Sequence, residues 1–538
     1  MKSFLALGAF VAFVSAQTGV FEPADFNVTK ALIANGVNVS AIPQLSGLVE
    51  RTSLSGCSIA CSSLKLIYGS EKLLSEQTPA YDTFTSTYWA AQQGELHPRC
   101  IFEPSSTVEV SSLVLISRLT QCPFAVKGGG HAAFAGASSI EGGITVSMKR
   151  FNIVAASNDK KYANVGPGNL WVDVYNKLEK SGLGVVGGRM APVGVPGLVL
   201  GGGISFFSNK VGWACDNVAA YEVVTASGLV VTATPAVFSD LYWALRGGGG
   251  NFGIVTNFKL DAFPLGQMWG GQRIFTENNF NGVLDALYNF AVTGSSKDTD
   301  AAEIVSFGFT PSIGKIAIVQ THYAQPVADP PVFDEIRALS PVMDDTAFGT
   351  LANMTMKTNG GSAEEALGNR QTMWDVSLKV DRELYTYLVD TFYTLLPEIQ
   401  AVEGLSPFIS IQAITEGQFR GMQKNGGNAL GLDAGKGPYF IMNMSAWWKK
   451  ASDDATVLKF FSTVMKNVKA YAKGKDLDND YIYMNYASEF EDPLASYGSA
   501  NVAKLIAVSK KYDPAQVFQK LHPGYFKLGQ GAPNKNMP

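Results

Sequence analysis

The segment from Pro123 to Gly136, PFAVKGGGHAAFAG, constrains the fold of this chain more than any other. A short apolar run, Phe124–Val126, is followed by Lys127, three glycines and His131. Because glycine lacks a Cβ atom, such a turn can adopt positive φ angles and bring its N–H groups close to a phosphate. The segment predicts a strand and a dinucleotide-binding turn that presents one imidazole. The alternative is an ordinary turn with a hydrogen-bonding histidine.

With 538 residues the chain is too long for one compact core, and we expect two domains of unequal size. The formal net charge is −4 and the basic residues are scattered, which argues against a nucleic-acid partner. Beyond the N-terminus no segment reaches about 18 uninterrupted apolar residues, so we expect no association with a membrane.

The N-terminus has the pattern of a secretory signal, with one lysine, an apolar run from Phe4 to Val14 and a small-residue end at Ala16. We therefore expect residues 1–16 to be removed and the protein to be secreted or kept in a secretory compartment. Four Asn-x-Ser/Thr sequons agree with a glycosylated product. They begin at Asn27, Asn38, Asn353 and Asn443.

The five cysteines, Cys57, Cys61, Cys100, Cys122 and Cys215, suit an exported protein with disulfides. Because their number is odd, at least one thiol stays free or pairs between chains, and Cys215 in the apolar GWACDNV is expected to be the buried free one. No Cys-x-x-Cys pair exists and the four histidines lie far apart in the sequence, so no metal site is expected.

Residues 17–93 are polar and predict an N-terminal cap with one short helix around Ser58–Leu66. A rhythm of helices and strands follows. Its predicted elements are a helix capped by Ser106 and ending near Thr120, strands Phe124–Val126, Ile144–Met148 and Tyr162–Val165, a helix from Leu170 to Lys180 capped by Asn169 and stopped by Gly182, a hairpin turning at Ser227-Gly228, a helix Asp240–Leu245 and a strand from Gly253. Neither a Walker pattern nor a Rossmann fingerprint is present.

The composition changes after Gly266, where glycine becomes rarer. Strands Lys315–Tyr323, Phe408–Ile414 and Tyr439–Trp447 interleave with amphipathic helices such as Asp381–Leu396. This mixture predicts an α+β domain with a largely antiparallel sheet. A strand from Tyr481, YIYMNY, and a helix from Asn501 to Lys511 are expected to close the chain.

Four segments share one order and spacing with a known family: PFAVKGGGHAAFAG, Val186–Gly203, GGGGNFGIVTNFKL and YMNYASEFEDPLASYG. Over nearly its whole length the chain resembles the secreted fungal FAD-linked oxidases of the vanillyl-alcohol-oxidase superfamily, in the berberine-bridge-enzyme-like branch. The resemblance implies an α+β fold with a two-part FAD-binding domain of PCMH type (94–266), a substrate-binding domain (267–479) and a C-terminal segment (480–538) that returns to the FAD domain.

By this resemblance, His131 bonds covalently to the 8α-methyl group of FAD. The chemistry is reasonable because an imidazole with an ordinary pKa near ~6.5 is largely neutral at pH 7 and can attack an electrophilic carbon. The other implied cofactor-binding residues are Lys127, Gly128, Gly129, Gly130, Ala132, Gly136, Met190, Val193, Gly194, Gly197, Gly201, Gly202, Gly253, Ile254, Val255 and Asn485.

Three positions determine how this chain compares with its relatives. Met190 stands where many relatives have a cysteine that forms a second bond to the flavin, so we expect a single covalent link through His131. Val193 matches the residue that controls the access of oxygen, and its small side chain favours an oxidase that uses O₂. Leu198 replaces a histidine that is frequent in plant members.

The segment Tyr483–Tyr486 matches the Tyr-x-Asn-Tyr motif of the family, in which Asn485 contacts the flavin. Tyr486 is either a general base or a residue that packs against the flavin ring. The strand FISIQAI resembles the one that covers the substrate face, which implies that Gln412 points at the substrate and that Glu416 supplies a carboxylate base.

The resemblance also pairs Cys61 with Cys122, which leaves Cys57 for Cys100. The expected protein is a monomeric oxidase that takes a hydride from a small organic substrate, favoured as a secondary metabolite, with coupled cyclisation left open. The alternatives are a carbohydrate or alcohol oxidase on the same scaffold, a flavin-containing cyclase without redox chemistry, and a binding protein that has lost its flavin.

Overall fold

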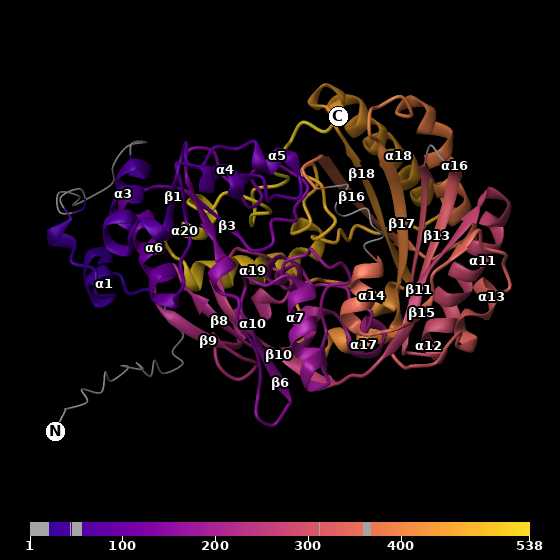
Figure 1. The fold of residues 1–538 in the computed structure, drawn as a ribbon, viewed down its shortest axis with the longest axis horizontal. Helices are drawn as coiled ribbons and strands as arrows, with labels where there is room; N and C mark the ends of the chain where they lie inside the picture. Colours follow the sequence, from indigo (N-terminus) through magenta and orange to yellow (C-terminus); the bar gives the residue numbers. More distant parts are fainter. Residues whose placement is uncertain (1–20, 43–44, 46–55, 311–312, 359–366) are drawn as a thin grey trace.

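The structure, a computed structural model, describes residues 21–42, 45, 56–310, 313–358 and 367–538. The expected signal peptide lies outside these residues. Figure 1 shows two parts side by side: one contains a four-stranded and a six-stranded sheet, and the other an eight-stranded sheet with helices on its outer face. The expected α+β class is confirmed. Within the described ranges, no helix is long and apolar enough to cross a membrane.

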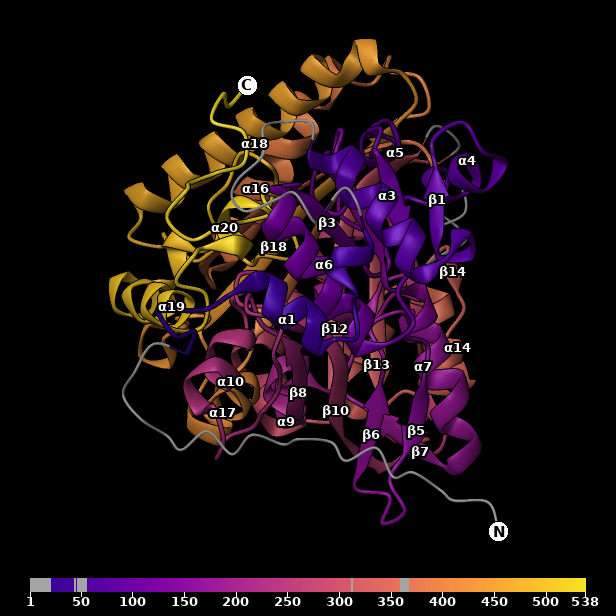
Figure 2. The same cartoon turned by 90° about the vertical axis from the view of Figure 1, so that its left-hand side faces the viewer.

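The four-stranded sheet has the order β1 (Leu73–Ser75), β2 (Cys100–Phe102), β4 (Ile144–Ser147) and β3 (Phe124–Lys127). Strands β2, β4 and β3 are parallel, and β1 is antiparallel to β2. Strand β1 belongs to residues 17–93, so this segment is built into the sheet and does not only cover it. The surrounding helices are α1 (Val28–Ala34), α3 (Gly56–Tyr68), α4 (Pro79–Thr85), α5 (Ala91–Gly94) and α6 (Thr107–Thr120), and Figure 2 shows α1, α3 and α6 on one outer side.

The two disulfides correct the expected pairing. They join Cys57 to Cys122 and Cys61 to Cys100, so the pairs Cys61–Cys122 and Cys57–Cys100 are wrong. Cys57 and Cys61 lie one turn apart on the same face of α3. Which of them meets Cys122 is decided by the direction in which α3 crosses the sheet, and sequence spacing does not contain that direction. Cys215 is free and buried, as expected.

The six-stranded sheet contains β5 (Val154–Ala156), β6 (Tyr162–Val165), β10 (Ile254–Pro264), β8 (Val218–Val224) and β9 (Val230–Ala233), with β7 (Leu183–Val185) paired to β10. Its helices are α7 (Trp171–Leu178), α8 (Val195–Leu200), α9 (Ser208–Val211) and α10 (Ser239–Leu245). The expected cap of α7 is wrong: Leu170 occupies the N-cap, because the Asn169 amide donates instead to the carbonyl oxygens of Ile153 and Gly166.

The eight-stranded sheet is antiparallel, as expected. Its order is β14 (Met343–Asp344), β11 (Met268–Thr276), β13 (Gly314–Tyr323), β12 (Ala301–Thr310), β17 (Ser406–Ile414), β18 (Tyr439–Trp448) and β16 (Arg370–Lys379), with β15 (Ala347–Gly349) beside β11. Its helices are α11 (Phe280–Asn289), α12 (Ser295–Lys297), α13 (Asp334–Arg337), α14 (Leu351–Thr358), α16 (Arg382–Leu395), α17 (Glu416–Met422) and α18 (Asp454–Gly474).

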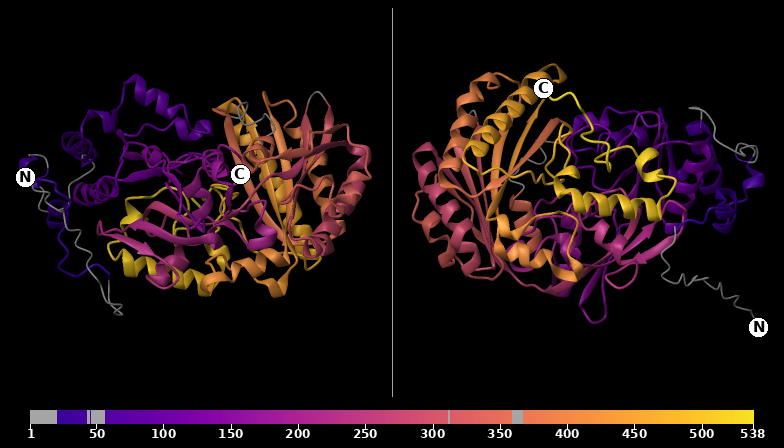
Figure 3. Two further views of the ribbon diagram at one scale, coloured as in Figure 1. Left: turned by 60° about the horizontal axis from the view of Figure 1, so that its bottom comes forward. Right: turned by 180° about the vertical axis from the view of Figure 1, so that it is seen from behind.

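The two faces of this sheet have different surroundings. One core contains Val305, Ile411 and Met442 of the sheet together with apolar residues of α11, α16 and α18. Because side chains alternate along a strand, the neighbouring residues point to the opposite face, which is turned toward the first part of the molecule in Figures 1 and 3. Asn443 lies on that face and is 7% exposed, so the expectation of a glycan at its sequon is incompatible with this fold.

The C-terminal segment returns to the first part, where α19 (Ser499–Tyr512) and α20 (Val517–Lys520) lie. The expected strand YIYMNY is absent from residues 481–486. Side chains satisfy its backbone in place of a neighbouring strand: the Tyr483 N–H donates to Asp375 and the Ile482 N–H to Ser496. Alternation of apolar residues in the sequence does not distinguish a backbone bonded to a neighbouring strand from a backbone bonded to side chains.

Candidate active site

The two glycine-rich segments predicted from the sequence lie against each other. A Cβ atom added to Gly129 would stand 2.6 Å from the Gly194 nitrogen, and one added to Gly194 would stand 2.3 Å from the Gly129 nitrogen. A Cβ atom added to Gly128 would likewise collide with the ring of Pro196, and Gly130 has a positive φ of 70°. Larger residues at these positions would push the two backbones apart.

His131 follows this contact and stacks on Trp89, with ring centroids 4.2 Å apart and an angle of 11° between the planes. Its Nε2 atom is buried and has no hydrogen-bond partner in the described part of the chain. Burial lowers the pKa of the imidazole to about 4, so the ring is neutral at pH 7 and its nitrogen lone pair is available. The imidazole therefore has the protonation state of a nucleophile.

The residues next to His131 fix the loop through contacts with the N-terminal segment. The Lys127 ammonium turns to the N-terminal segment, donates to Thr87 at 2.9 Å and lies over the rings of Phe84 and Tyr88. Burial, assisted by the charge of Lys149, lowers the pKa of Lys127 to about 8. The carbonyl oxygen of Ala132 accepts a hydrogen bond from Gln93, and Gly136 has a positive φ of 82°.

The second glycine segment also contacts the C-terminal segment. The amide of Asn485 donates to the carbonyl oxygen of Leu198 and to the Tyr483 hydroxyl, both at 3.0 Å. A Cβ atom at Gly201 would collide with Asn485 at 2.1 Å. The Tyr483 hydroxyl in turn accepts from the N–H groups of Gly203 and Ile204. One segment therefore links the His131 loop to the Tyr-x-Asn-Tyr motif.

Two polar side chains from distant segments meet at the Tyr486 hydroxyl. Arg189 donates to this oxygen at 2.9 Å, and the Gln412 amide nitrogen donates to it at 3.1 Å. Arg189 comes from the second glycine segment and Gln412 from β17. A cationic and a neutral donor aimed at one phenol oxygen stabilise negative charge that develops there.

Other sequence-predicted residues lie outside this group. Glu416 begins α17, its side chain is 67% exposed, and it pairs with Arg420 at 2.7 Å, so the fold does not bring it to Tyr486. The Ile254 and Val255 side chains are buried in hydrophobic cores, where β10 pairs with β8 after Gly253. Three further positions, Met190, Val193 and Gly197, lie on the second glycine segment, and in the same part of the chain Gly202 has a φ of 113°.

His322 on β13 lies near Arg189 and was not singled out from the sequence. Its ring packs against Phe206, with centroids 4.0 Å apart and the planes tilted by 30°, and its Nε2 atom is 3.4 Å from the Thr358 hydroxyl. Burial, reinforced by the charges of Arg189 and Lys357, lowers the pKa of His322 to about 3. The imidazole is therefore neutral and adds no second cation beside Arg189.

Two buried carboxylic acids hold the segment that carries Tyr486. Asp375 on β16 accepts a hydrogen bond from the Tyr483 N–H at 2.8 Å. Glu491 accepts from the N–H and the hydroxyl of Ser488, at 2.8 and 2.9 Å, and from the Asp375 N–H at 3.2 Å. Burial raises the pKa of Glu491 to about 7 and that of Asp375 well above its ordinary value.

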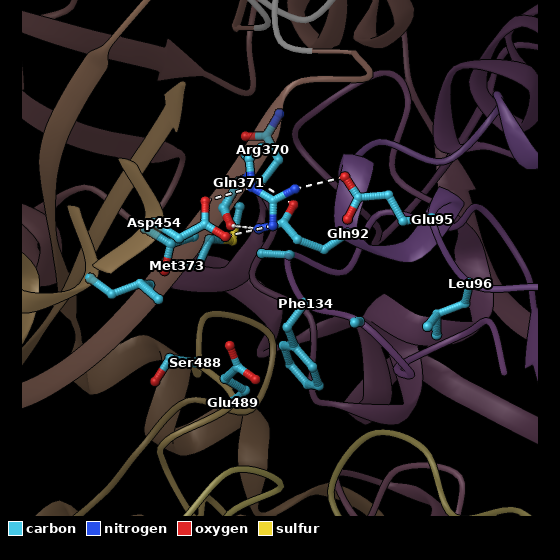
Figure 4. Close-up of a pocket in the computed structure, with 14 residues that line it drawn as sticks. Gln92, Glu95, Leu96, Phe134, Arg370, Gln371, Met373, Asp454, Ser488 and Glu489 are labelled. Carbon is cyan, nitrogen blue, oxygen red and sulfur yellow. Dashed lines mark hydrogen bonds and ion pairs between the residues drawn. The ribbon is translucent and has the colours of Figure 1, made fainter. Parts of the chain in front are cut away.

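A cavity of about 250 Å³ lies between the two parts of the molecule, next to the His131 loop. Figure 4 shows Arg370 of β16 between Asp454 of α18 and Glu95, the C-cap residue of α5, with Phe134 below them. Arg370 contacts Asp454 at 2.5 Å and Glu95 at 2.7 Å. Gln92 and Gln371 exchange two hydrogen bonds beside this ion pair, at 2.8 and 3.1 Å. These contacts fix one edge of the interface between the two parts.

Comparisons with known proteins identify this chain. Residues 98–234 match a family described as an FAD binding domain. An FAD-dependent monooxygenase of Cochliobolus heterostrophus is 36% identical over 456 residues, which cover 82% of this chain and 87% of the relative. The chain belongs to the FAD-dependent oxidoreductases. A second relative of this oxidoreductase, the bifunctional solanapyrone synthase of Alternaria solani, is 31% identical over 506 residues, which cover 93% of this chain and 94% of the relative.

Solved structures show the same fold for this oxidoreductase. Berberine-bridge-enzyme-like protein 1 of Physcomitrella patens matches with a TM-score of 0.71 and 20% identity, over 89% of this chain and 100% of that one. The 6-hydroxy-D-nicotine oxidase of Arthrobacter nicotinovorans matches with a TM-score of 0.68 and 19% identity, over 87% of this chain and 97% of that one. These structures confirm the expected fold, and the sequence relatives confirm the expected FAD-dependent family.

The residues of this oxidoreductase fit FAD. The N–H groups of Gly129, Gly130 and Ala132 donate to no acceptor within the described residues, which suits a turn that binds a pyrophosphate. The buried, unpartnered Nε2 atom of His131 suits a bond to the ring system. Among the described residues, no group of three or more His, Cys, Asp or Glu side chains is suited to a metal ion.

Sequence reasoning missed two members of this site. Arg189 stands within the quoted glycine segment, but nothing local shows that its guanidinium reaches a tyrosine 297 positions later. Trp89 falls in the segment interpreted as a cap, and its stacking on His131 depends on how that segment folds back. Trp89 is the one tryptophan among residues 17–93, which is the signal that could have singled it out.

Proposed function

We propose that this FAD-dependent oxidoreductase is an oxidase that removes a hydride from a carbon atom of a small organic substrate of the secondary-metabolite type. The observation that carries the proposal is the Tyr486 hydroxyl, which receives hydrogen bonds from Arg189 and Gln412 at the face between the two parts. Bound FAD would supply the electron acceptor, which takes up the hydride and passes two electrons to O₂ to give H₂O₂.

His131 holds the cofactor in this proposal. Its neutral ring and unpartnered Nε2 atom support a covalent bond to FAD, with the backbone of residues 128–132 and Gly136 around the pyrophosphate. Met190, without a thiol, leaves His131 as the single link. Asn485 is fixed against Leu198 and Tyr483, so it lies against the second glycine segment, which also contacts the His131 loop.

Tyr486 is the general base. The phenolate oxygen accepts the proton of a substrate O–H or N–H group as the hydride leaves the adjacent carbon, so the substrate loses two electrons and two hydrogens. Arg189 stabilises the phenolate charge, and Gln412 orients the oxygen toward the sheet. Glu416 is not proposed as the base because its carboxylate is exposed and paired with Arg420.

Two features support an oxidase and an apolar substrate. Val193, which is partly buried beside the core of the FAD-binding part, presents a small side chain at the position that controls oxygen access in relatives. The face of the eight-stranded sheet that carries Gln412 also presents Ile304, Ile318 and Phe408, which suit an apolar ring system better than a sugar.

A second candidate is a monooxygenase, which the names of several fungal relatives favour. The two functions differ in the fate of oxygen. With ¹⁸O₂, an oxidase yields labelled H₂O₂ and unlabelled product, whereas a monooxygenase yields a labelled product. The name of the bifunctional solanapyrone synthase keeps a coupled second step, such as cyclisation, within the proposal.

The first experiment is anaerobic addition of substrate to the purified protein. Loss of flavin absorbance near ~450 nm supports the redox mechanism, and product formed without bleaching refutes it. The second experiment is acid denaturation, after which the yellow colour stays with wild type and is released from His131→Ala. Equal release from both proteins refutes the covalent link.

We also propose that the protein acts as a monomer and matures in the secretory pathway. Its two disulfides, Cys57–Cys122 and Cys61–Cys100, support an oxidising compartment. Mass spectrometry of the secreted protein tests both removal of residues 1–16 and glycosylation. Size-exclusion chromatography with light scattering tests the oligomeric state.

A further inference from the structure

The inner face of the eight-stranded sheet is incompletely covered at its centre. Strands β13, β12 and β17 occupy the middle of the sheet. On the helix-covered face their residues are buried, as Val305 and Val319 show. On the inner face Ile304, Ser306 and Ser410 remain partly exposed. Side chains in the middle of a sheet retain exposure only where nothing packs on them, so this face leaves room for a small molecule.

A row of polar residues crosses this face. The strand register places Asp375 of β16 opposite Asn443 of β18, Asn443 opposite Ser410 of β17, and Ser410 opposite Ser306 of β12. The two serine hydroxyls form a hydrogen bond of 2.7 Å. Four polar side chains in one row are unusual on an inner face, where apolar residues cost less to bury.

Two buried amide atoms, one in this row and one beside it, have no hydrogen-bond partner among the residues that the structure describes, and neither has the Oδ1 atom of Asp375 in the row. The Asn443 Nδ2 atom is buried without a hydrogen bond in a side chain that is 7% exposed, and the Gln412 Oε1 atom is likewise unpartnered in a side chain that is 3% exposed. Gln412 lies in the next row of the same face, two residues along the strand from Ser410, because Gln412 pairs with Ile441 and Ser410 with Asn443. Buried polar atoms are nearly always bonded in folded proteins, so a donor and an acceptor left without partners at this incompletely covered face indicate a polar ligand.

We propose that Asn443 and Ser410 bind a carbonyl oxygen of the substrate. The ligand class is a small apolar ring system with a ketone, aldehyde or lactone group, whose oxygen accepts from the Asn443 amide and whose frame lies over Ile304 and Ile318. Diagonal neighbours across two antiparallel strands are roughly 7 Å apart, so this oxygen lies about that far from Gln412. The carbonyl would thereby set which carbon approaches Tyr486. The inference rests on the proposed function, whose substrate class it narrows.

The test compares two probes that differ only in a carbonyl group, 1-tetralone and tetralin. Their dissociation constants for the oxidised flavoprotein are measured by isothermal titration calorimetry, which needs no turnover. We expect wild type to bind 1-tetralone more tightly, and Asn443→Leu, which keeps the shape but removes the donor, to lower this preference about fivefold, the value of one hydrogen bond. Ser410→Ala is expected to lower the preference for 1-tetralone in the same way. It replaces Asn443→Leu in the test if that variant does not fold.

Ser445→Ala is the matched control, because Ser445 lies on the same strand and face, one row away, opposite Phe408 and Met373. This variant keeps the wild-type preference. Equal affinities of wild type for both probes overturn the inference. So does an unchanged preference in Asn443→Leu, because Asn443 would then only support Asp375 across the strand.

The binding test of the carbonyl site and the bleaching test of the oxidase can fail independently. An unchanged preference in the variants, with normal anaerobic bleaching of wild type, rejects the carbonyl site and leaves the oxidase. A preference that depends on Asn443, without any bleaching, supports the carbonyl site and rejects the oxidase.

Discussion

Glu491 makes the stability of this protein depend on pH in an unusual direction. Burial raises the pKa of its carboxyl group from 4.5 to about 7, against the lowering effect of hydrogen bonds from Ser488 and Asp375 and of the charge of Lys469. The neighbouring Asp375 has a pKa raised well above its ordinary value, mainly by burial and then by Glu491. The folded protein therefore retains protons that the unfolded chain releases.

The sign and the size of this pH dependence follow from the difference in proton binding between the folded and the unfolded protein. Between pH 4.5 and about 7 the unfolded chain loses the Glu491 proton while the folded protein keeps it, so the free energy of unfolding falls as pH rises and levels off above pH 7. At about 1.4 kcal/mol per pH unit, the loss from this one group is about 3 kcal/mol.

Glu491→Gln removes this dependence, because glutamine imitates the protonated acid. It keeps an acceptor for Ser488, and its amino group takes the position of the Oε1 atom, which has no partner in the described part of the chain. Urea denaturation at pH 5 and pH 8 measures the effect. Relative to wild type, the variant gains about 2 to 3 kcal/mol more at pH 8 than at pH 5. The control is Glu416→Gln, which replaces an exposed carboxylate and leaves the pH dependence unchanged.

A stability curve of Glu491→Gln that runs parallel to the wild-type curve between pH 5 and pH 8 refutes this reasoning. It would show that Glu491 is ionised in the folded protein. The carboxylate would then stabilise the segment that carries Tyr486 as an anion, and the lowering effects of its hydrogen bonds would outweigh burial.

Further predictions concern the site and the interface. Tyr486→Phe removes the proposed base and lowers kcat about a hundredfold or more, with unchanged flavin content, as stopped-flow reduction measures; an unaltered rate removes Tyr486 from the mechanism. Gly129→Ala places a Cβ atom 2.6 Å from the Gly194 nitrogen, so we expect loss of bound flavin and about 1 to 3 kcal/mol of stability, checked by absorbance and thermal unfolding. Arg370→Met breaks the ion pair with Glu95 between the two parts and the ion pair with Asp454 within the second part, and costs about 1 to 2 kcal/mol, less at high salt; a salt-independent loss contradicts an electrostatic origin.

Features that depend on neighbouring residues were predictable from the sequence. Strand Tyr162–Val165 has its expected bounds, and the helix expected at Asp381–Leu396 spans Arg382–Leu395, because alternation and capping are local properties. The glycine turn before His131 was expected for the same reason, since the absence of Cβ atoms is a property of the residues themselves. Its fit to FAD is supported by the contact of Gly129 with Gly194.

Features that depend on distant segments were decided by the tertiary structure. The cysteine pairing followed the direction of α3 across the sheet, and YIYMNY became irregular because Asp375 and Ser496 satisfy its backbone. Sequence identified Tyr486 and Gln412 as candidates but gave Glu416 equal standing, and only packing separated the exposed carboxylate from the amide that meets the phenol. The sequence by itself determined the glycine turn and the family. The structure decided which side chains meet, because such contacts depend on the packing of every element between them.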